Sequence, residues 1–385
     1  MPLKHTPYWP LSGFYFFYFA ALGILVPYWG LYLQWEGFSA EEIGELTAIL
    51  LATRIVAPNL WGWIADRHGG RMSIVRLASL AGAIAFIALL FNNGYSWIAV
   101  GMLAFSFFWN ASLPQFEVVT LQHLAHNSHY YSKIRLWGSI GFIVAVVSIG
   151  ALLEVVDASI IPYAMLFALL AIWVVSLTIS EPPSQPVDLE HPPLLSLLKR
   201  PEVIAFLSIC VLVQISHGPY YTFYTIYLEQ HHYSRSLIGQ LWALGVVAEI
   251  IIFLFMHNWL PRFGLRLVLL LSLLLSSLRW LMIGFFPDSL VLLILAQLLH
   301  AASFGSFHAA AMSWIHHYFT GKNQGQGQAL YSSIGYGLGG AIGSLASGYF
   351  WLSPGPTVTF SLAAASTLLA FIICFKWLHN PKPSV

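Results

Sequence analysis

Several ionisable side chains of this chain stand alone inside long apolar stretches, and they are its best candidates for chemistry. Glu249 lies in LGVVAEIIIF and Arg279 in LLLSSLRWLM. A carboxyl group in such surroundings can take up and release a proton, and an arginine can hold an anion through its planar set of N–H donors. An unpaired charge costs about 2.5–3.5 kcal/mol or more at the centre of a bilayer, so these residues are candidates for function. The other members of the set are Arg54, Glu117, Arg135, His217, His300 and His308.

Covalent and metal chemistry are not indicated by the same sequence. The apolar stretches hold no His-x-x-x-His, no Gly-x-Ser-x-Gly and no pair of aspartates, and the sequence has no P-loop. Cys210 and Cys374 both lie in apolar runs, which argues against a disulfide framework or a cysteine metal site. The closely spaced His123, His126 and His129 are expected to be solvated loop residues. We therefore expect a protein that is not an enzyme and that carries no metal or organic cofactor.

Helical spacing places many polar residues on stripes that continue along one face of an apolar helix. A stripe of this kind indicates a face turned toward water instead of lipid. The sequence therefore predicts that the stripes line one wet cavity. The stripes are Gln214, His217, Tyr221 and Tyr224; Gln297, His300, Phe304 and His308; Ser272, Ser276 and Arg279; Ser106, Asn110 and Glu117; and Arg135, Ser139 and Phe142.

Two carboxylates on these helices have specific expected roles. Glu117 and Arg135 lie on neighbouring predicted helices at similar depth, so a cross-helix carboxylate and guanidinium pair is expected. That pair either contacts a transported solute or only staples the two helices. Glu249 is the best proton carrier, because a carboxyl group in a low-dielectric cavity is favoured in its charged form only while a cation is near.

The rest of the sequence is built for a membrane. Of its 385 residues 58% are hydrophobic and only 8% are charged, against roughly 25% charged in a soluble domain, and the mean hydropathy is +0.74. About twelve apolar runs are long enough to cross the hydrocarbon core, among them 203 to 227, 289 to 313 and 327 to 351. The expected fold class is an all-α membrane protein embedded in the lipid bilayer. The balance of 16 Lys plus Arg against 15 Asp plus Glu argues against nucleic-acid binding.

Basic residues outside the apolar runs, with the single exception of Arg235, fall on one side of the expected membrane. Because loops rich in Lys and Arg stay in the cytoplasm, both termini are predicted to be cytoplasmic. The Pro-rich stretch 181–201 is then a cytoplasmic linker between domains. The basic residues are Lys4, Arg67, Arg71, Arg76, Lys133, Lys199, Arg200, Arg262, Arg266, Lys322, Lys376 and Lys382.

The two halves of the chain resemble each other when the sequence is shifted by 195 residues. Because this shift preserves helix direction, it predicts parallel repeats: two six-helix bundles, residues 1–180 and 202–385, around a central cavity. The matches include Gly23 with Gly218, Ser39 with Ser234, and Arg67, Gly69 and Arg71 with Arg262, Gly264 and Arg266; at the same shift Arg54 meets Glu249.

The segment GWIADRHGGR resembles the loop motif of the major facilitator superfamily. Two glycines allow a short turn, an acidic residue can engage neighbouring helix ends, and basic residues face anionic lipid. The matching residues are Gly62, Asp66, Arg67, Gly69 and Arg71, while Gly70 replaces a basic position. The strings KIRLWGSIGF and LWALGVVAEIIIF are similar to helices 5 and 8 of the phenylpropionate permease branch, which is related to lactose permease and the nucleoside proton symporters.

This resemblance implies roles for individual residues. Lactose permease has a Glu on helix 4 and an Arg on helix 5 at the separation of Glu117 and Arg135, and these contact sugar. Arg279 resembles its helix-9 Arg. The sequence departs from that pattern on helix 10, where Ser303 follows His300 at the spacing at which lactose permease has a Glu. Proton coupling must therefore rest on another carboxylate or on a histidine.

Residues and resemblance together predict a multi-pass transporter of the cell inner membrane that works by alternating access, with a proton as the coupling ion. Dense aromatic residues in 15–19 and 220–227 favour a small aromatic carboxylate such as phenylpropionate, and the monomer is expected to be functional. A sugar or nucleoside proton symporter, an exporter of the same fold and a transporter-like sensor are the alternatives. Proton coupling is assigned to Glu249, Arg279, His300 and His308, and substrate binding to Arg54, Glu117, Arg135, Phe142, His217 and Tyr221.

Overall fold

The computed structural model describes residues 7–124, 130–181, 194–320 and 323–380, and it is helical throughout these ranges, with no strand. The chain divides into two compact units: the first unit is residues 1–188 with 234–240, and the second unit is residues 189–233 with 241–385. Within the described ranges, eleven helical segments are long and apolar enough to cross a membrane. The expected all-α membrane fold is confirmed. The predicted linker 181–201 lies mostly outside the described residues.

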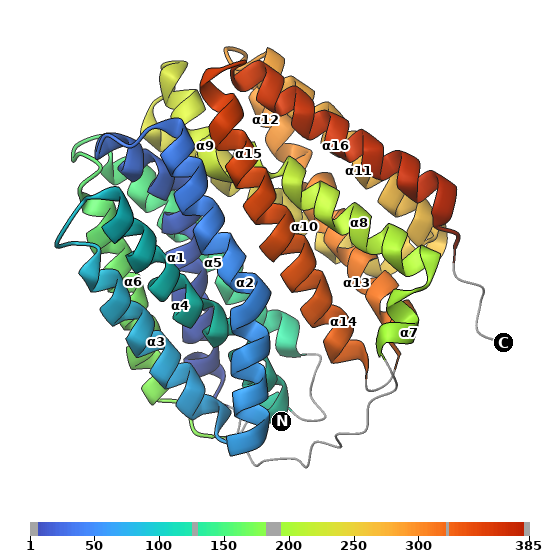
Figure 1. The fold of residues 1–385 in the computed structure, drawn as a ribbon, viewed down its shortest axis with the longest axis horizontal. Helices are drawn as coiled ribbons and strands as arrows, with labels where there is room; N and C mark the ends of the chain where they lie inside the picture. Colours follow the sequence, from blue (N-terminus) through green and yellow to red (C-terminus); the bar gives the residue numbers. More distant parts are fainter. Residues whose placement is uncertain (1–6, 125–129, 182–193, 321–322, 381–385) are drawn as a thin grey trace. The chain divides into compact units, whose positions relative to one another are not determined.

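The first unit contains six helices, which run from blue to green in Figure 1. They are α1 (Tyr8–Trp35), α2 (Ala40–His68), α3 (Arg71–Ala88), α4 (Tyr95–Leu124), α5 (Tyr131–Leu152) and α6 (Ile160–Leu177). The most buried of them is α1, which packs against α5 and α6, while α3 packs against α4 and α6. Ser39 starts α2 with a capping box, in which the Ser39 hydroxyl accepts from the Glu42 N–H and the Glu42 carboxylate accepts from the Ser39 N–H.

The second unit has the same number of predicted spans, but three of them are interrupted. Its elements are α7 (Leu194–Leu198), α8 (Pro201–Ser216), α9 (Gly218–Gln230), α10 (Arg235–Phe263), α11 (Leu265–Phe285), α12 (Leu290–Leu298), the π-helix η2 (Ala301–Ser306), α13 (Phe307–Tyr318), α14 (Gln324–Leu330), the π-helix η4 (Tyr331–Gly339), α15 (Gly340–Leu352) and α16 (Pro356–Trp377). The predicted membrane-crossing runs 203 to 227 and 289 to 313 are present as the spans Pro201–Gln230 and Leu290–Tyr318, although the helices within all three runs are interrupted. In the span 203 to 227, α8 ends before His217 and a new helix, α9, begins at Gly218 and Pro219. In the other two spans, the π-helices η2 and η4 interrupt the α-helix.

Inside each unit the helices pack in the same order. The contacts of α1 with α5 and α6 in the first unit recur as the contacts of α8 with η4 and α16 in the second. Gly23 and Gly218, which the repeat places at the same position, both allow this close approach. A methyl group at Gly23 would lie 2.7 Å from the Phe142 carbonyl oxygen, and one at Gly218 would lie 2.3 Å from the Gly343 carbonyl group. The internal repeat seen in the sequence is thus present in the packing.

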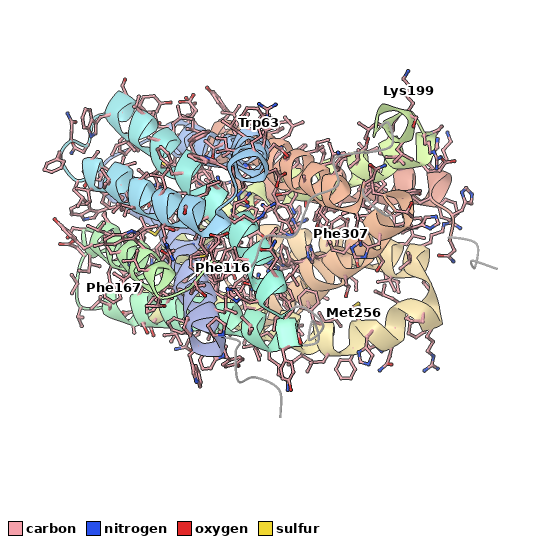
Figure 2. All side chains as sticks on the ribbon, turned by 90° about the horizontal axis from the view of Figure 1, so that it is seen from below. Trp63, Phe116, Phe167, Lys199, Met256 and Phe307 are labelled. Carbon is pink, nitrogen blue, oxygen red and sulfur yellow. The ribbon has the colours of Figure 1, made fainter. Side chains whose placement is uncertain are left out.

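The outer side chains of the units are largely apolar. Figure 2 shows Phe167 and Trp63 on the outside of the first unit, where they are 69% and 52% exposed, whereas Phe116 is fully buried inside it. In the second unit Phe307 and Met256 belong to the buried core. An apolar surface over apolar helices is the arrangement expected where lipid replaces water as solvent.

Candidate functional site

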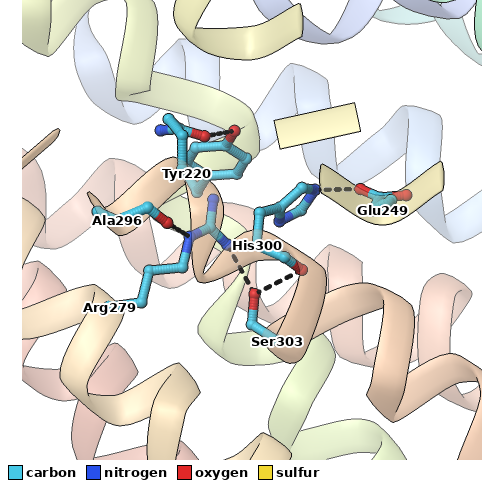
Figure 3. Close-up of polar contacts among 7 residues, drawn as sticks. Tyr220, Glu249, Arg279, Ala296, His300 and Ser303 are labelled. Carbon is cyan, nitrogen blue, oxygen red and sulfur yellow. Dashed lines mark hydrogen bonds and ion pairs between the residues drawn. The ribbon is translucent and has the colours of Figure 1, made fainter. Parts of the chain in front are cut away.

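The strongest polar contact at depth in the second unit joins Glu249 of α10 to His300, which lies between α12 and η2. The Glu249 Oε1 atom and the His300 Nε2 atom are 2.6 Å apart, and the two side chains are 14% and 6% exposed. Figure 3 shows the pair at one end of a set of polar contacts. The sequence assigned both residues to proton coupling but did not pair them, because they lie on elements far apart in the chain.

Arg279 of α11 is fully buried beside this pair. Its Nε donates to the Ala296 carbonyl oxygen at 3.1 Å, and its Nη1 donates to the Ser303 hydroxyl at 3.0 Å (Figure 3). The guanidinium carbon also lies 4.2 Å from the centre of the Tyr220 ring and 4.4 Å from that of Trp280. Ser303 is therefore a direct partner of the arginine.

Tyr220 and Trp280 were missed by the sequence reasoning, although they form the walls around Arg279. Tyr220 donates to Gln297 Oε1 at 2.9 Å, and Gln297 Nε2 donates to the Tyr224 hydroxyl at 2.6 Å. Tyr220 follows His217 by three residues, so helical spacing could have placed it on the same face. Trp280 gives no such signal, since it only follows Arg279 in an apolar run.

The polar stripes expected on helices 7 and 10 come together but are less open than predicted. The ring of His217 lies 6.3 Å from that of His300 and 6.5 Å from that of Phe304. The sequence placed these stripes on a wet face, whereas the structure buries five of the members because the two faces pack against each other. The buried members are Gln214, His217, Tyr224, Gln297 and His300, while Tyr221, Phe304 and His308 are half-buried.

His308 continues the stripe of His300 on the next turns. The Phe304 ring stacks between the two histidines, with ring centres 5.6 Å from His300 and 6.0 Å from His308. His308 Nδ1 lies 3.1 Å from the hydroxyl of Tyr331, which lies 3.5 Å from the hydroxyl of Tyr336. The predicted coupling residues Glu249, His300 and His308 thus lie along one line of polar and aromatic groups.

The first unit holds the expected charged residues in a different way. The Arg135 guanidinium lies over the Phe19 ring, 3.8 Å from its centre, and 5.6 Å from the centre of Tyr15. Glu117 accepts a hydrogen bond of 3.4 Å from Tyr131. In the part of this unit that the structure describes, Glu117 and Arg135 form no direct ion pair, and their pairing stays a prediction. Each side chain contacts an aromatic residue, and the two charges are near enough to interact electrostatically.

Arg54 of α2 forms a hydrogen bond with Asn110, a neutral residue of α4. Its Nε donates to Asn110 Oδ1 at 3.2 Å, and Asn110 Nδ2 donates to the Thr53 hydroxyl at 2.8 Å. When the sequence is shifted by 195 residues, Arg54 aligns with Glu249 and Asn110 aligns with Gly305. A methyl group at Gly305 would lie 3.7 Å from Glu249 Cγ, so the same two positions also meet in the second unit. Phe142 of α5, the remaining predicted ligand of this unit, is half-buried.

The loop motif forms a short, ordered turn between α2 and α3. Gly69 and Gly70 have φ of +66° and +72°, values that favour glycine, and they let α3 begin at Arg71. Arg71 pairs with Asp66 and also donates to Gln115 of α4 at 2.5 Å, while Arg67 lies over the Trp63 ring. A methyl group at Gly62 would lie 3.5 Å from the Gln115 amide. The motif therefore links the ends of α2, α3 and α4.

Metal ligands do not gather anywhere in the described residues: no group of three His, Cys, Asp or Glu side chains could hold an ion there. His123 Nε2 lies 3.0 Å from the Ser180 carbonyl oxygen, and His126 and His129 lie outside the described residues.

Solved structures with this arrangement of helices are those of membrane transporters. The crystal structure of the nucleoside transporter NupG matches with a TM-score of 0.83 at 18% identity, over 98% of this chain and 100% of that one. A bacterial homologue of the human lysosomal transporter Spinster, inward-facing and occupied, matches with a TM-score of 0.73 at 13% identity over 100% of both chains. These TM-scores establish a shared all-helical membrane fold, and at identities this low they establish the fold alone.

The sequence comparison gives the family. The model described as the MFS_1 like family matches residues 8–362, and the chain therefore belongs to this family of major facilitator transporters. The Probable 3-phenylpropionic acid transporter of Escherichia coli (strain K12) is 29% identical over 97% of this chain and 98% of its own length. The Maltose permease of Geobacillus stearothermophilus is 26% identical over 94% of this chain and 93% of its own.

Proposed function

We propose that this transporter is a proton symporter for a small aromatic carboxylate, which it imports across the inner membrane by alternating access. The observation that carries the proposal is the buried contact between Glu249 and His300 beside Arg279. With Glu249 ionised, its charge and that of Arg279 balance. When one proton is added, Glu249, His300 and Arg279 together carry one positive charge, and a bound anion would neutralise that charge. Proton uptake and anion uptake are then favourable together.

The substrate contacts are proposed to lie in the first unit, at Arg135 and its neighbours. Among the described residues the Arg135 guanidinium has aromatic contacts but no hydrogen bond, so its planar set of donors is available to a carboxylate. Phe19 and Tyr15 offer ring faces at the same place, and ring stacking suits an aromatic acid. Glu117, Arg54 and Phe142 of the same unit are the further proposed contacts. Tyr221 is proposed separately as a substrate contact of the second unit.

The relatives support a small organic substrate without fixing its class. The name of the Escherichia coli relative refers to an aromatic carboxylate, whereas the Geobacillus relative is a maltose permease and NupG carries nucleosides. We prefer the carboxylate because Arg54 and Arg135 meet aromatic or neutral groups in the described structure instead of carboxylates. A neutral sugar or nucleoside would leave these arginines without a counter-charge.

Transport into liposomes that contain the purified protein separates these classes by charge. Symport of one proton with a monoanion moves no net charge, so an inside-alkaline gradient of one pH unit should drive about tenfold accumulation of phenylpropionate, and a membrane potential alone should drive none. A neutral sugar or nucleoside would instead accumulate under the potential. Protein-free liposomes correct for passive entry of the acid. Failure of the pH gradient to drive saturable, protein-dependent accumulation of any solute in the panel would contradict proton symport.

We also propose that both termini and the linker 181–201 are cytoplasmic, that the transporting domains are residues 1–180 and 202–385, and that the monomer is functional. Reporter fusions after Lys199 and after Val385 should both give a cytoplasmic signal, because the basic residues cluster on that side. An external signal at either position contradicts the topology.

A further inference from the structure

Among the buried nitrogen atoms of the second unit that have no hydrogen-bond partner, three belong to neighbouring ionisable side chains: Nε2 of His217, Nη2 of Arg279 and Nδ1 of His300; Nε1 of Trp280 beside them is a fourth. The three ionisable residues are only 0%, 0% and 5% exposed. A buried polar atom without a partner costs about 1–3 kcal/mol, so three in one place call for an explanation. They come from three elements that are separate in sequence, namely the break between α8 and α9, helix α11 and the start of η2.

The three side chains surround the same two aromatic residues. Arg279 and His217 both pack on Trp280, with 4.4 Å from the guanidinium carbon and 4.9 Å from the imidazole centre to the ring centre. Arg279 and His300 both pack on Tyr220, at 4.2 Å and 5.6 Å. Figure 3 shows the guanidinium and the His300 ring side by side under Tyr220. Since the two imidazole centres are 6.3 Å apart, a single small molecule can reach both rings.

In each histidine, the hydrogen-bond partner of one ring nitrogen determines whether the other, unpartnered nitrogen is a donor or an acceptor. His217 Nδ1 lies 2.8 Å from the Val213 carbonyl oxygen, which only accepts, so Nδ1 carries the hydrogen and Nε2 of the neutral ring is an acceptor. His300 Nε2 donates to ionised Glu249, so its Nδ1 is an acceptor too. Arg279 Nη2 is always a donor. The three atoms therefore offer one donor and two acceptors.

We propose that these three atoms bind one buried water molecule, which connects His217 to the Glu249 and His300 pair. The water oxygen accepts from Arg279 Nη2, and its two hydrogens are donated to His217 Nε2 and His300 Nδ1. Three hydrogen bonds are typical of a buried water. An anion in the same place would need all three nitrogens to donate, and two protonated histidines beside a buried arginine would concentrate positive charge at high cost.

The connection makes His217 a second place for the transported proton, an inference that rests on the proposed proton symport. When His300 holds the proton, its Nδ1–H bond breaks as the water takes that proton and passes one of its own to His217 Nε2. The water is regenerated, and the charge has moved from His300 to His217. His217 would then act in the proton path, not in substrate contact.

The protonation states can be measured in the unmodified protein by ¹⁵N NMR of labelled histidines in lipid bilayers. We expect neutral His217 with hydrogen on Nδ1, neutral His300 with hydrogen on Nε2, and water cross-peaks at both rings; His217→Gln and His300→Gln assign the signals. Hydrogen on Nε2 of His217, or no water contact at either ring, overturns the proposal. Imidazolium signals on both rings at neutral pH also overturn it, because they indicate an anion instead of water.

Transport by His217→Gln tests the second part, with His257→Gln, at an exposed position of α10, as the matched control. We expect His217→Gln to lower proton-driven uptake at least about tenfold and to leave solute exchange within twofold of wild type, since only the proton path is altered. His257→Gln should equal wild type in both. Equal proton-driven uptake by the two variants removes His217 from the path. The proposed symport is judged separately, by the pH-gradient experiment on the wild-type protein.

Discussion

The charged residues of the two units are held in contrasting ways although the units share one packing plan. In the first unit Arg54, Glu117 and Arg135 are half-buried, and each contacts a neutral or aromatic side chain. In the second unit Glu249 and Arg279 are tied into contacts with His300 and Ser303. The two units therefore hold their charges differently: neutral and aromatic partners in the first, and a carboxylate and imidazole contact beside a buried arginine in the second.

A single pair of repeat positions shows how this difference arises. In the first unit position 54 is arginine and its neighbour on α4 is Asn110, whose amide binds it. In the second unit the equivalent positions are Glu249 and Gly305. Glycine offers no side chain to bind, so the carboxylate is left to His300 at 2.6 Å. The exchange of Asn110 for Gly305 thus turns an amide contact into a contact between two groups that can share a proton.

The largest structural effect is expected where helices approach closely at the repeat-related positions Gly23 and Gly218. Gly218→Ala would place a methyl group 2.3 Å from backbone atoms of Gly343, and Gly23→Ala one 2.7 Å from the Phe142 carbonyl oxygen. We expect losses of about 1–3 kcal/mol in both, larger for Gly218→Ala, measured as lower melting temperatures in detergent. Gly13→Ala is the control, since its methyl group would meet Val175 at an ordinary 3.5 Å. Equal stability of all three variants would contradict the shared packing plan.

Arg135→Lys should separate binding from coupling. Lysine keeps the charge but loses the planar donors and the stacking on Phe19, so substrate affinity should fall about tenfold, roughly 1.4 kcal/mol. The accumulation ratio at saturating substrate should not change, because the proton groups lie in the other unit. Binding and proton-driven accumulation are measured on the same preparation. Unchanged affinity with lower accumulation would reverse the roles given to the two units.

The smallest effect is expected at the loop motif, which the second unit only partly repeats. Asp66 pairs with Arg71 in the first unit, whereas Pro261 stands at the equivalent position of the second. The Asp66 side chain is 39% exposed, so Asp66→Asn should lower stability by no more than about 1 kcal/mol. The loss should shrink in 1 M salt, where screening weakens the pair. A loss that is independent of salt would mean that the carboxylate has a different role.

Most of the fold could be predicted from the sequence because it depends on properties that repeat along the chain. The length of the apolar runs, the match at a shift of 195 residues and the loop motif were enough to predict the architecture. Ser39 and Ser234, which the repeat aligns, both cap helices. The helix breaks at His217, η2 and η4 were not predictable, because hydropathy is the same for a straight and an interrupted helix. Glu249 and His300 were each identified, but their contact depends on how α10 faces η2. Glu117 and Arg135 were also identified, but the sequence could not show that Glu117 contacts Tyr131 and that Arg135 lies over Phe19.

The central claim is that Glu249 couples the proton to transport, and Glu249→Gln tests it most directly. Glutamine keeps the shape but stays neutral, so we predict that pH-driven accumulation is abolished while exchange of internal for external solute continues. Glu202→Gln, at an exposed carboxylate of α8, is the matched control and should behave as wild type. Both activities are measured side by side in liposomes with equal amounts of protein. Undiminished pH-driven accumulation in Glu249→Gln would contradict the claim, and loss of exchange together with accumulation would assign Glu249 a structural role instead.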